Sequence, residues 1–121
     1  MKIVVSGSHL PAVKVIAEEI RSIGHEAAVA WPAATAAITA ADWAADAALL
    51  DIATGEDAVR ICKALRSDPK LGRCKVIALW EPSAIDFAAI SLFDAVLQKP
   101  VDVSVLASAL GDKSVDGPYD R

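Results

Sequence analysis

The sequence predicts an α/β protein in which helices cover both faces of a five-stranded parallel sheet. Short apolar runs alternate five times with segments of helical periodicity, which is typical of βαβ units. The runs are almost continuously apolar, as expected for parallel strands buried on both faces. The 121 residues suit one domain. The simplest closure is a doubly wound sheet of strand order 2-1-3-4-5, with a ligand crevice beyond the carboxyl ends of the strands.

The five expected strands are short apolar runs bounded by turn residues. They cover residues 2–6, 25–31, 47–52, 74–80 and 94–100. The third run ends in "LLD", so Asp51 is expected at the carboxyl edge of the sheet, beside the crevice.

The first helix is expected after Ser8 as its N-cap, with Pro11 in the first turn and Gly24 as the stop. The second, over residues 33–45, is rich in alanine and weakly patterned. Three further helices are expected on the same grounds. They run from about Ala58 to Leu65, from near Ser83, and over residues 102–110. We expect Trp31 and Trp43 to cover edges of the core.

Composition excludes several classes of function. The net charge is −4 and no basic run occurs, so a nucleic-acid partner is not expected. Cys62 and Cys74 lack metal-ligand spacing and predict reduced thiols in a cytoplasmic protein. No signal peptide or membrane-spanning run is expected. The polar tail, residues 111–121, predicts a disordered segment or linker after a domain of residues 1–110.

Short motifs along residues 1–110 together resemble one known family. They are "VVSGS", "LLD", "RSDP", "KVIAL" and "LQKP", in that order and spacing. The set resembles the receiver domain of two-component response regulators, whose fold is a flavodoxin-like (βα)5 sandwich. In that family an aspartate at the position of Asp51 accepts a phosphoryl group. A lysine before proline, here Lys99, contacts the phosphoryl oxygens.

Four other positions depart from the family pattern. The acid pair that holds Mg²⁺ falls on Ser6 and Gly7. The hydroxyl residue at the end of the fourth strand is replaced by Trp80, and the switch aromatic by Val96. The resemblance therefore implies a degenerate site.

These departures bear on the chemistry of the site. Mg²⁺ binds oxygen ligands, usually with one or two carboxylates, and phosphoryl transfer depends on cations that neutralise developing charge. With the acid pair lost, we expect no metal or other cofactor, with Mg²⁺ binding weak or absent. Asp51 is expected to pair directly with Lys99.

The sequence thus predicts an atypical receiver that works by protein–protein interaction in two-component signalling, without the usual Mg²⁺-dependent phosphorylation. Its partners would be a histidine kinase or a downstream regulator. A homodimer through the fourth helix, fifth strand and fifth helix is a further expectation from the resemblance. No independent enzyme is expected, because no nucleophile and base can be paired.

Two alternatives remain open at this point. In one, a histidine kinase still phosphorylates Asp51. In the other, the chain is a small-ligand module of the same fold, and the turn at residues 6–8 before the first helix binds an anion through backbone N–H groups.

Overall fold

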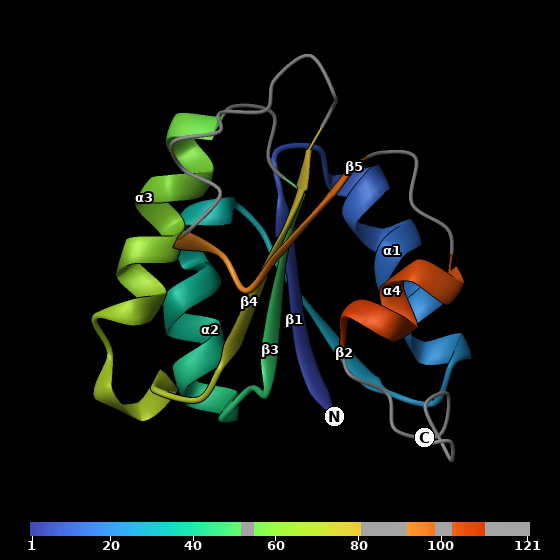
Figure 1. The fold of residues 1–121 in the computed structure, drawn as a ribbon, viewed down its shortest axis with the longest axis horizontal. Coiled ribbons are helices and arrows are strands. Elements are labelled where there is room, and N and C mark those ends of the chain that lie inside the picture. The colour runs from blue at the N-terminus through green and yellow to red at the C-terminus, as the bar shows by residue number, and fades with distance from the viewer. Residues whose placement is uncertain (52–54, 81–91, 99–102, 111–121) are drawn as a thin grey trace.

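The predicted sheet is confirmed in a computed structural model that describes residues 1–51, 55–80, 92–98 and 103–110. Five parallel strands pair in the order β2-β1-β3-β4-β5. Their bounds are β1 Lys2–Gly7, β2 Glu26–Ala30, β3 Ala47–Asp51, β4 Lys75–Trp80 and β5 Ala95–Gln98. All five therefore end at the same edge of the sheet, as Figure 1 shows.

Helices cover both faces of this sheet (Figure 1). Helices α1 (Leu10–Ser22) and α4 (Val103–Ala109) lie on one face, and α2 (Ala36–Trp43) and α3 (Gly55–Arg66) on the other. Two short 3-10 helices, η1 (Ala33–Thr35) and η2 (Pro69–Leu71), complete the described elements. Helix α4 is the expected fifth helix. The helix expected near Ser83 and the tail 111–121 lie outside the described residues.

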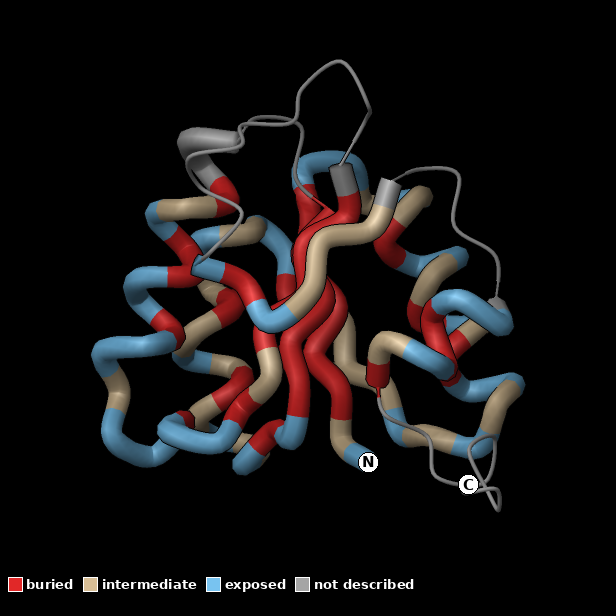
Figure 2. Tube along the Cα trace, in the orientation of Figure 1, coloured by how far each residue is buried: buried red, intermediate tan, exposed pale blue. Residues whose placement is uncertain are grey.

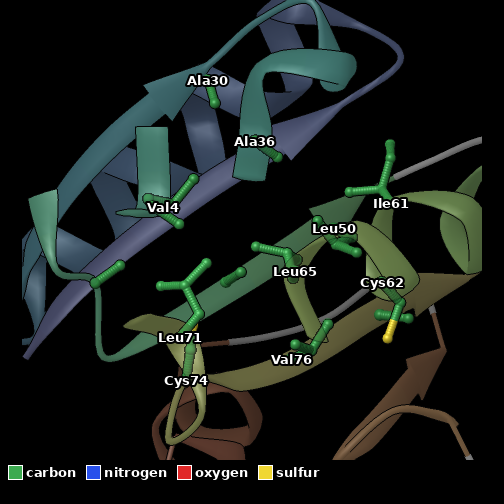
Figure 3. Packing of buried hydrophobic residues seen from close by; sticks show 14 of the residues in the cluster. Val4, Ala30, Ala36, Leu50, Ile61, Cys62, Leu65, Leu71, Cys74 and Val76 are labelled. Atoms are coloured by element: carbon green, nitrogen blue, oxygen red, sulfur yellow. The ribbon is translucent and has the colours of Figure 1, made fainter. Parts of the chain in front are cut away.

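The sheet separates two apolar clusters, because side chains alternate between its faces. Val4 and Leu50 pack beneath α2 and α3 with Leu65, in the cluster drawn in Figure 3. Ile3 and Leu49 belong to the second cluster, with α1 and α4. The central strands are buried along most of their length, as Figure 2 shows. This burial explains their continuously apolar sequences.

Helix boundaries correct two of the sequence expectations. The N-cap of α1 is His9 rather than Ser8, and its side chain makes no capping hydrogen bond, although Pro11 does lie in the first turn. The second helix ends at Trp43 because Ala44 takes a left-handed conformation with φ 55°. Such a residue terminates a helix in the manner of a C′ glycine.

The two tryptophans beside the second helix behave differently. Trp43 packs against the cluster beneath α2 and α3, as expected. Trp31 is 50% exposed, so the expectation that it covers a core edge is wrong. Among the described residues, no helix combines the length and apolar character needed to cross a membrane.

Candidate functional site

The candidate site is the carboxyl edge of the sheet, where β1 and β3 end side by side. Asp51 is the last residue of β3 and lies opposite Gly7 in the register of the two strands. The Ser8 N–H donates to the Asp51 carbonyl oxygen at 3.1 Å. Asp51 is buried, with 5% of its surface exposed. The structure therefore places Asp51 where the sequence predicts it, in close backbone contact with the end of β1.

Gly7 fills a position where this backbone has no room for a side chain. A Cβ atom built there would overlap the Asp51 carbonyl oxygen and lie 2.7 Å from Val13 Cγ2. The first of these atoms belongs to a central strand, so it cannot move aside as the end of a flexible side chain could. Glycine is therefore required by the close approach of β1, β3 and α1.

Ser6, the other residue at the acid-pair positions, uses its hydroxyl to join two strands. Its Oγ donates to the Ala30 carbonyl oxygen at 2.7 Å, and the residue is completely buried. A buried hydroxyl needs such a partner, because its burial without one costs free energy. Ser6 thus attaches the carboxyl end of β2 to β1.

This end of β1 does not fit a magnesium ion. Mg²⁺ requires near-octahedral oxygen coordination, usually with carboxylates. Gly7 offers no side chain, and the Ser6 hydroxyl is bonded within the sheet. Across the described part of the chain, no three His, Cys, Asp or Glu side chains gather as possible metal ligands.

The remaining family positions are only partly described. Val96, at the switch-aromatic position, is half-buried in β5 and packs against the cluster beneath α2 and α3. Trp80 is the last residue of β4 and pairs with Gln98. The Trp80 side chain and Lys99 lie outside the described residues, so the Asp51–Lys99 pair stays a prediction.

At the opposite edge of the sheet, two acidic residues form an arrangement that sequence reasoning missed. Asp46 directly precedes β3; its N–H donates to the Lys2 carbonyl at 2.7 Å, and its carboxylate accepts the Lys2 N–H at 2.8 Å. Asp94 directly precedes β5 and repeats this exchange with Val76 at 2.8 and 2.7 Å. The signal was present in the sequence, because Asp-Ala opens both apolar runs, "DAALL" and "DAVLQ".

Asp94 is also held by Arg66, at the end of α3. Arg66 Nη2 lies 2.9 Å from Asp94 Oδ2 and donates to the Leu92 carbonyl at 3.2 Å. Partial burial disfavours the charged form of Asp94 and by itself would raise its pKa. This effect is outweighed by the hydrogen bonds from Val76 and Arg66 and by the positive charge of Arg66. The pKa of Asp94 is therefore lowered from its ordinary value. This network fastens the start of β5 to α3 and β4.

The two cysteines are buried free thiols, as expected. Burial raises the pKa of Cys62 and, more strongly, raises the pKa of Cys74 to about 11; the nearby Arg66 charge offsets only part of either change. Thiols with such pKa values stay protonated at neutral pH and are poor nucleophiles.

The fold has well-defined counterparts among solved structures. A CheY-like response regulator receiver domain from Methylobacillus flagellatus is similar with a TM-score of 0.80 and 21% identity, over 92% of this chain and 96% of that one. Chemotaxis protein CheY4 of Vibrio cholerae is similar with a TM-score of 0.76 and 16% identity, over 91% and 95% of the two chains.

A third similar structure is the receiver domain of a sensor histidine kinase from Pseudomonas aeruginosa, which has a magnesium ion coordinated in its active-site cleft. Its TM-score is 0.71 and its identity 20%, over 90% of this chain and 93% of that one. No protein-family model matches the sequence, and no curated protein matches it either. The likeness is therefore one of structure, and the chain has the fold of CheY-like response regulator receiver domains.

Proposed function

We propose that this chain is an atypical receiver domain in two-component signalling, which acts through protein contacts and without Mg²⁺-dependent phosphorylation of Asp51. The observation that carries the proposal is the closed end of β1. Gly7 has no space for a side chain against the Asp51 backbone, and the Ser6 hydroxyl bonds to Ala30.

The consequence for phosphoryl transfer is electrostatic. The reaction depends on positioning and on cations that neutralise the charge developing on the phosphoryl oxygens. An acid pair would supply the ligands for such a cation, and here both positions serve the packing of strands instead. Asp51 is also 5% exposed, which limits the approach of a phosphodonor. Both features favour a domain with one stable conformation.

The fold supports a proposal for the class of partner. Receiver domains occur beside kinases and regulators, and one structurally similar domain belongs to a sensor histidine kinase. We therefore propose a histidine kinase or a downstream regulator as the partner, in the cytoplasm. We propose no enzymatic activity of its own.

Incubation with acetyl phosphate and Mg²⁺, followed by intact-protein mass spectrometry, tests the proposal. We expect no phosphoryl adduct in the wild-type protein. The matched control is Asp51→Asn, which removes the acceptor. An adduct that the wild type forms and Asp51→Asn lacks would establish the alternative, in which Asp51 still takes part in a phosphorelay.

A second measurement uses the backbone amide spectrum. Mg²⁺ added with beryllofluoride, a phosphoryl mimic, should leave the amides of β4 and β5 unchanged. Saturable binding of Mg²⁺ below about 1 mM, within the range of working sites for hard cations, would contradict the proposal. Shifts confined to the Gly7 and Ser8 amides on addition of phosphate would instead favour the small-ligand alternative.

A further inference from the structure

The outer face of α2 exposes apolar side chains where a solvent-facing helix normally carries charges. We define this face by Ile38 and Asp42 on α2, Ala34 on the adjoining η1, and Trp31 just before η1, all of them exposed. Ile38 is 65% exposed, the highest value for a large apolar side chain among the described residues, and Trp31 is 50% exposed. Residues 27–41 contain no charged side chain, in a chain that is 23% charged. An uncharged surface with exposed apolar side chains is suited to contact with another protein.

Neither end of α2 carries the charge that a helix dipole favours, and its carboxyl end carries an unfavourable one. The first turn has no acidic residue, and Thr35, its N-cap, makes no capping bond; its hydroxyl donates to the Pro32 carbonyl instead. At the other end, Asp42 lies in the last turn, which has no basic residue. Helices are stabilised by anions at the amino end and by cations at the carboxyl end. Helix α2 therefore has a polarity that a second helix in the reverse direction would complement.

We propose that a second copy of this chain docks on the outer face of α2, with the two helices antiparallel about a twofold axis at Ile38. Ile38 then packs against its symmetry mate. Residue 34 of one copy lies opposite residue 42 of the other, because both are four positions from the centre. Each Asp42 carboxylate thus comes close to the amino end of the partner's helix, where small Ala34 leaves room for it.

The charge of the chain restricts where a second copy can dock. The net charge of −4 makes two copies repel wherever acidic surfaces meet. A twofold interface joins the same patch on both copies. Its centre must therefore be neutral, and each charged side chain must lie near a group of opposite charge on the other copy. The outer face of α2 meets both conditions.

The neighbouring edge of β2 is a poorer docking site. The Glu26 N–H bonds to Met1 on the side of β1, so alternation turns the Ala27 carbonyl outward. Arg21 Nη2 donates to this carbonyl at 2.9 Å. A charged side chain on a strand edge opposes pairing with another strand, so the association is assigned to the helix.

The contact is small. An eight-residue helix is only about 12 Å long. The area that it can bury is therefore smaller than the roughly 800 Å² that each partner buries in a standard stable interface. The dimer is therefore weak and depends on concentration. It is independent of the proposed function, and it differs from a dimer through β5 and α4.

Sedimentation equilibrium of the full chain, from low micromolar concentration to about 1 mM, tests the proposal. We expect a reversible monomer–dimer equilibrium. Ile38→Lys should abolish the dimer, because it places two like charges at the twofold axis. The matched controls are Val15→Lys on α1 and Val105→Lys on α4, which replace side chains that are 59% and 43% exposed. Both should dimerise like the wild type.

Asp42→Lys tests the orientation of the helices. It should weaken the dimer about tenfold, because two symmetry-related contacts between charge and helix dipole become repulsive. Its melting temperature at low concentration should not fall, since a cation suits the end of its own helix. This readout separates lost association from lost folding.

Two results would overturn the proposal. One is a wild-type protein that stays monomeric up to about 1 mM, which would leave the face to a different protein. The other is a dimer that Val105→Lys breaks and Ile38→Lys does not, which would assign the contact to the face of β5 and α4.

Discussion

At the amino edge of the sheet, Asp46 and Asp94 each accept the backbone N–H of a neighbouring strand. At the carboxyl edge, two of the three positions that are acidic in receiver domains hold Ser6 and Gly7. There Ser6 bonds to a carbonyl and Gly7 packs against one. The same parallel sheet thus uses aspartates to align strands at its amino edge, whereas a hydroxyl and a glycine make the close strand contacts at its carboxyl edge.

The role of an acidic residue at the end of a strand therefore depends on the groups that surround it. Asp94 is held by Val76 and Arg66, so its negative charge is satisfied within the fold. A carboxylate at position 7 would have neither space nor a cation from the described residues. The acids of the amino edge therefore align strands, whereas Ser6 and Gly7 at the carboxyl edge are engaged in contacts within the sheet.

Gly7→Asp, which introduces an acid at the carboxyl edge, is the strongest way to test the contrast. The new side chain would overlap the Asp51 carbonyl and crowd Val13. We expect a loss of about 3 kcal/mol in the free energy of unfolding, measured in urea. The control Gly72→Ala places its Cβ 3.6 Å from the Pro69 carbonyl, an ordinary contact, and should change stability by less than about 0.5 kcal/mol. Equal stability of the two variants would show that the end of β1 is not tightly closed.

Asp94→Ala tests the amino edge. It removes the acceptor for the Val76 N–H, which should cost about 1.5 kcal/mol in unfolding free energy. The ion pair with Arg66 adds little, because both side chains are 40% exposed. Asp46→Ala, which releases the Lys2 N–H at a more exposed site, should cost less. The reverse order would contradict the role given to Asp94.

Ser6→Ala tests the strand attachment at the carboxyl edge. Loss of the buried bond to the Ala30 carbonyl should lower unfolding free energy by about 1 kcal/mol. Ser67→Ala removes a similar bond, 3.0 Å long, to the Ala64 carbonyl on the surface, and should change stability by less than about 0.5 kcal/mol. A wild-type melting curve for Ser6→Ala would show that its hydroxyl does not hold β2.

The smallest effect is a dependence on pH at the amino edge. Folding lowers the pKa of Asp94 from its unfolded value near 3.8. The ionised carboxylate therefore stabilises the fold at pH values above this unfolded pKa. This stabilisation is lost as the pH falls through the pKa of the folded state. The stability difference between wild type and Asp94→Asn should therefore be largest near pH 6. It should shrink by less than about 1 kcal/mol below pH 4, because the site is partly exposed. Urea unfolding of both proteins across this range measures it, and a difference that grows on acidification would reverse the assigned sign.

Much of the fold could be predicted from local patterns. Alternating apolar runs and helical periodicity predicted the five strands and placed Asp51 at the end of β3, because burial on both faces demands continuous apolar strands. The strand order was predicted as the simplest closure of a doubly wound sheet, and it is confirmed. The N-cap at His9 and the exposure of Trp31 were mispredicted. Capping propensity favoured Ser8, and the tertiary path of the chain overrode it. An aromatic residue is usually buried, and no local pattern marked Trp31 as an exception.

By itself, the sequence determined the class of fold, the positions of the five strands and the absence of acids from the end of β1. These properties depend on residue type and spacing along the chain. Only the tertiary structure decided that Gly7 touches the Asp51 backbone, that Ser6 bonds to Ala30, and that Asp94 exchanges hydrogen bonds with Val76. Each of these contacts joins segments distant in sequence, and its geometry is set by strand register and close packing, which no local pattern encodes.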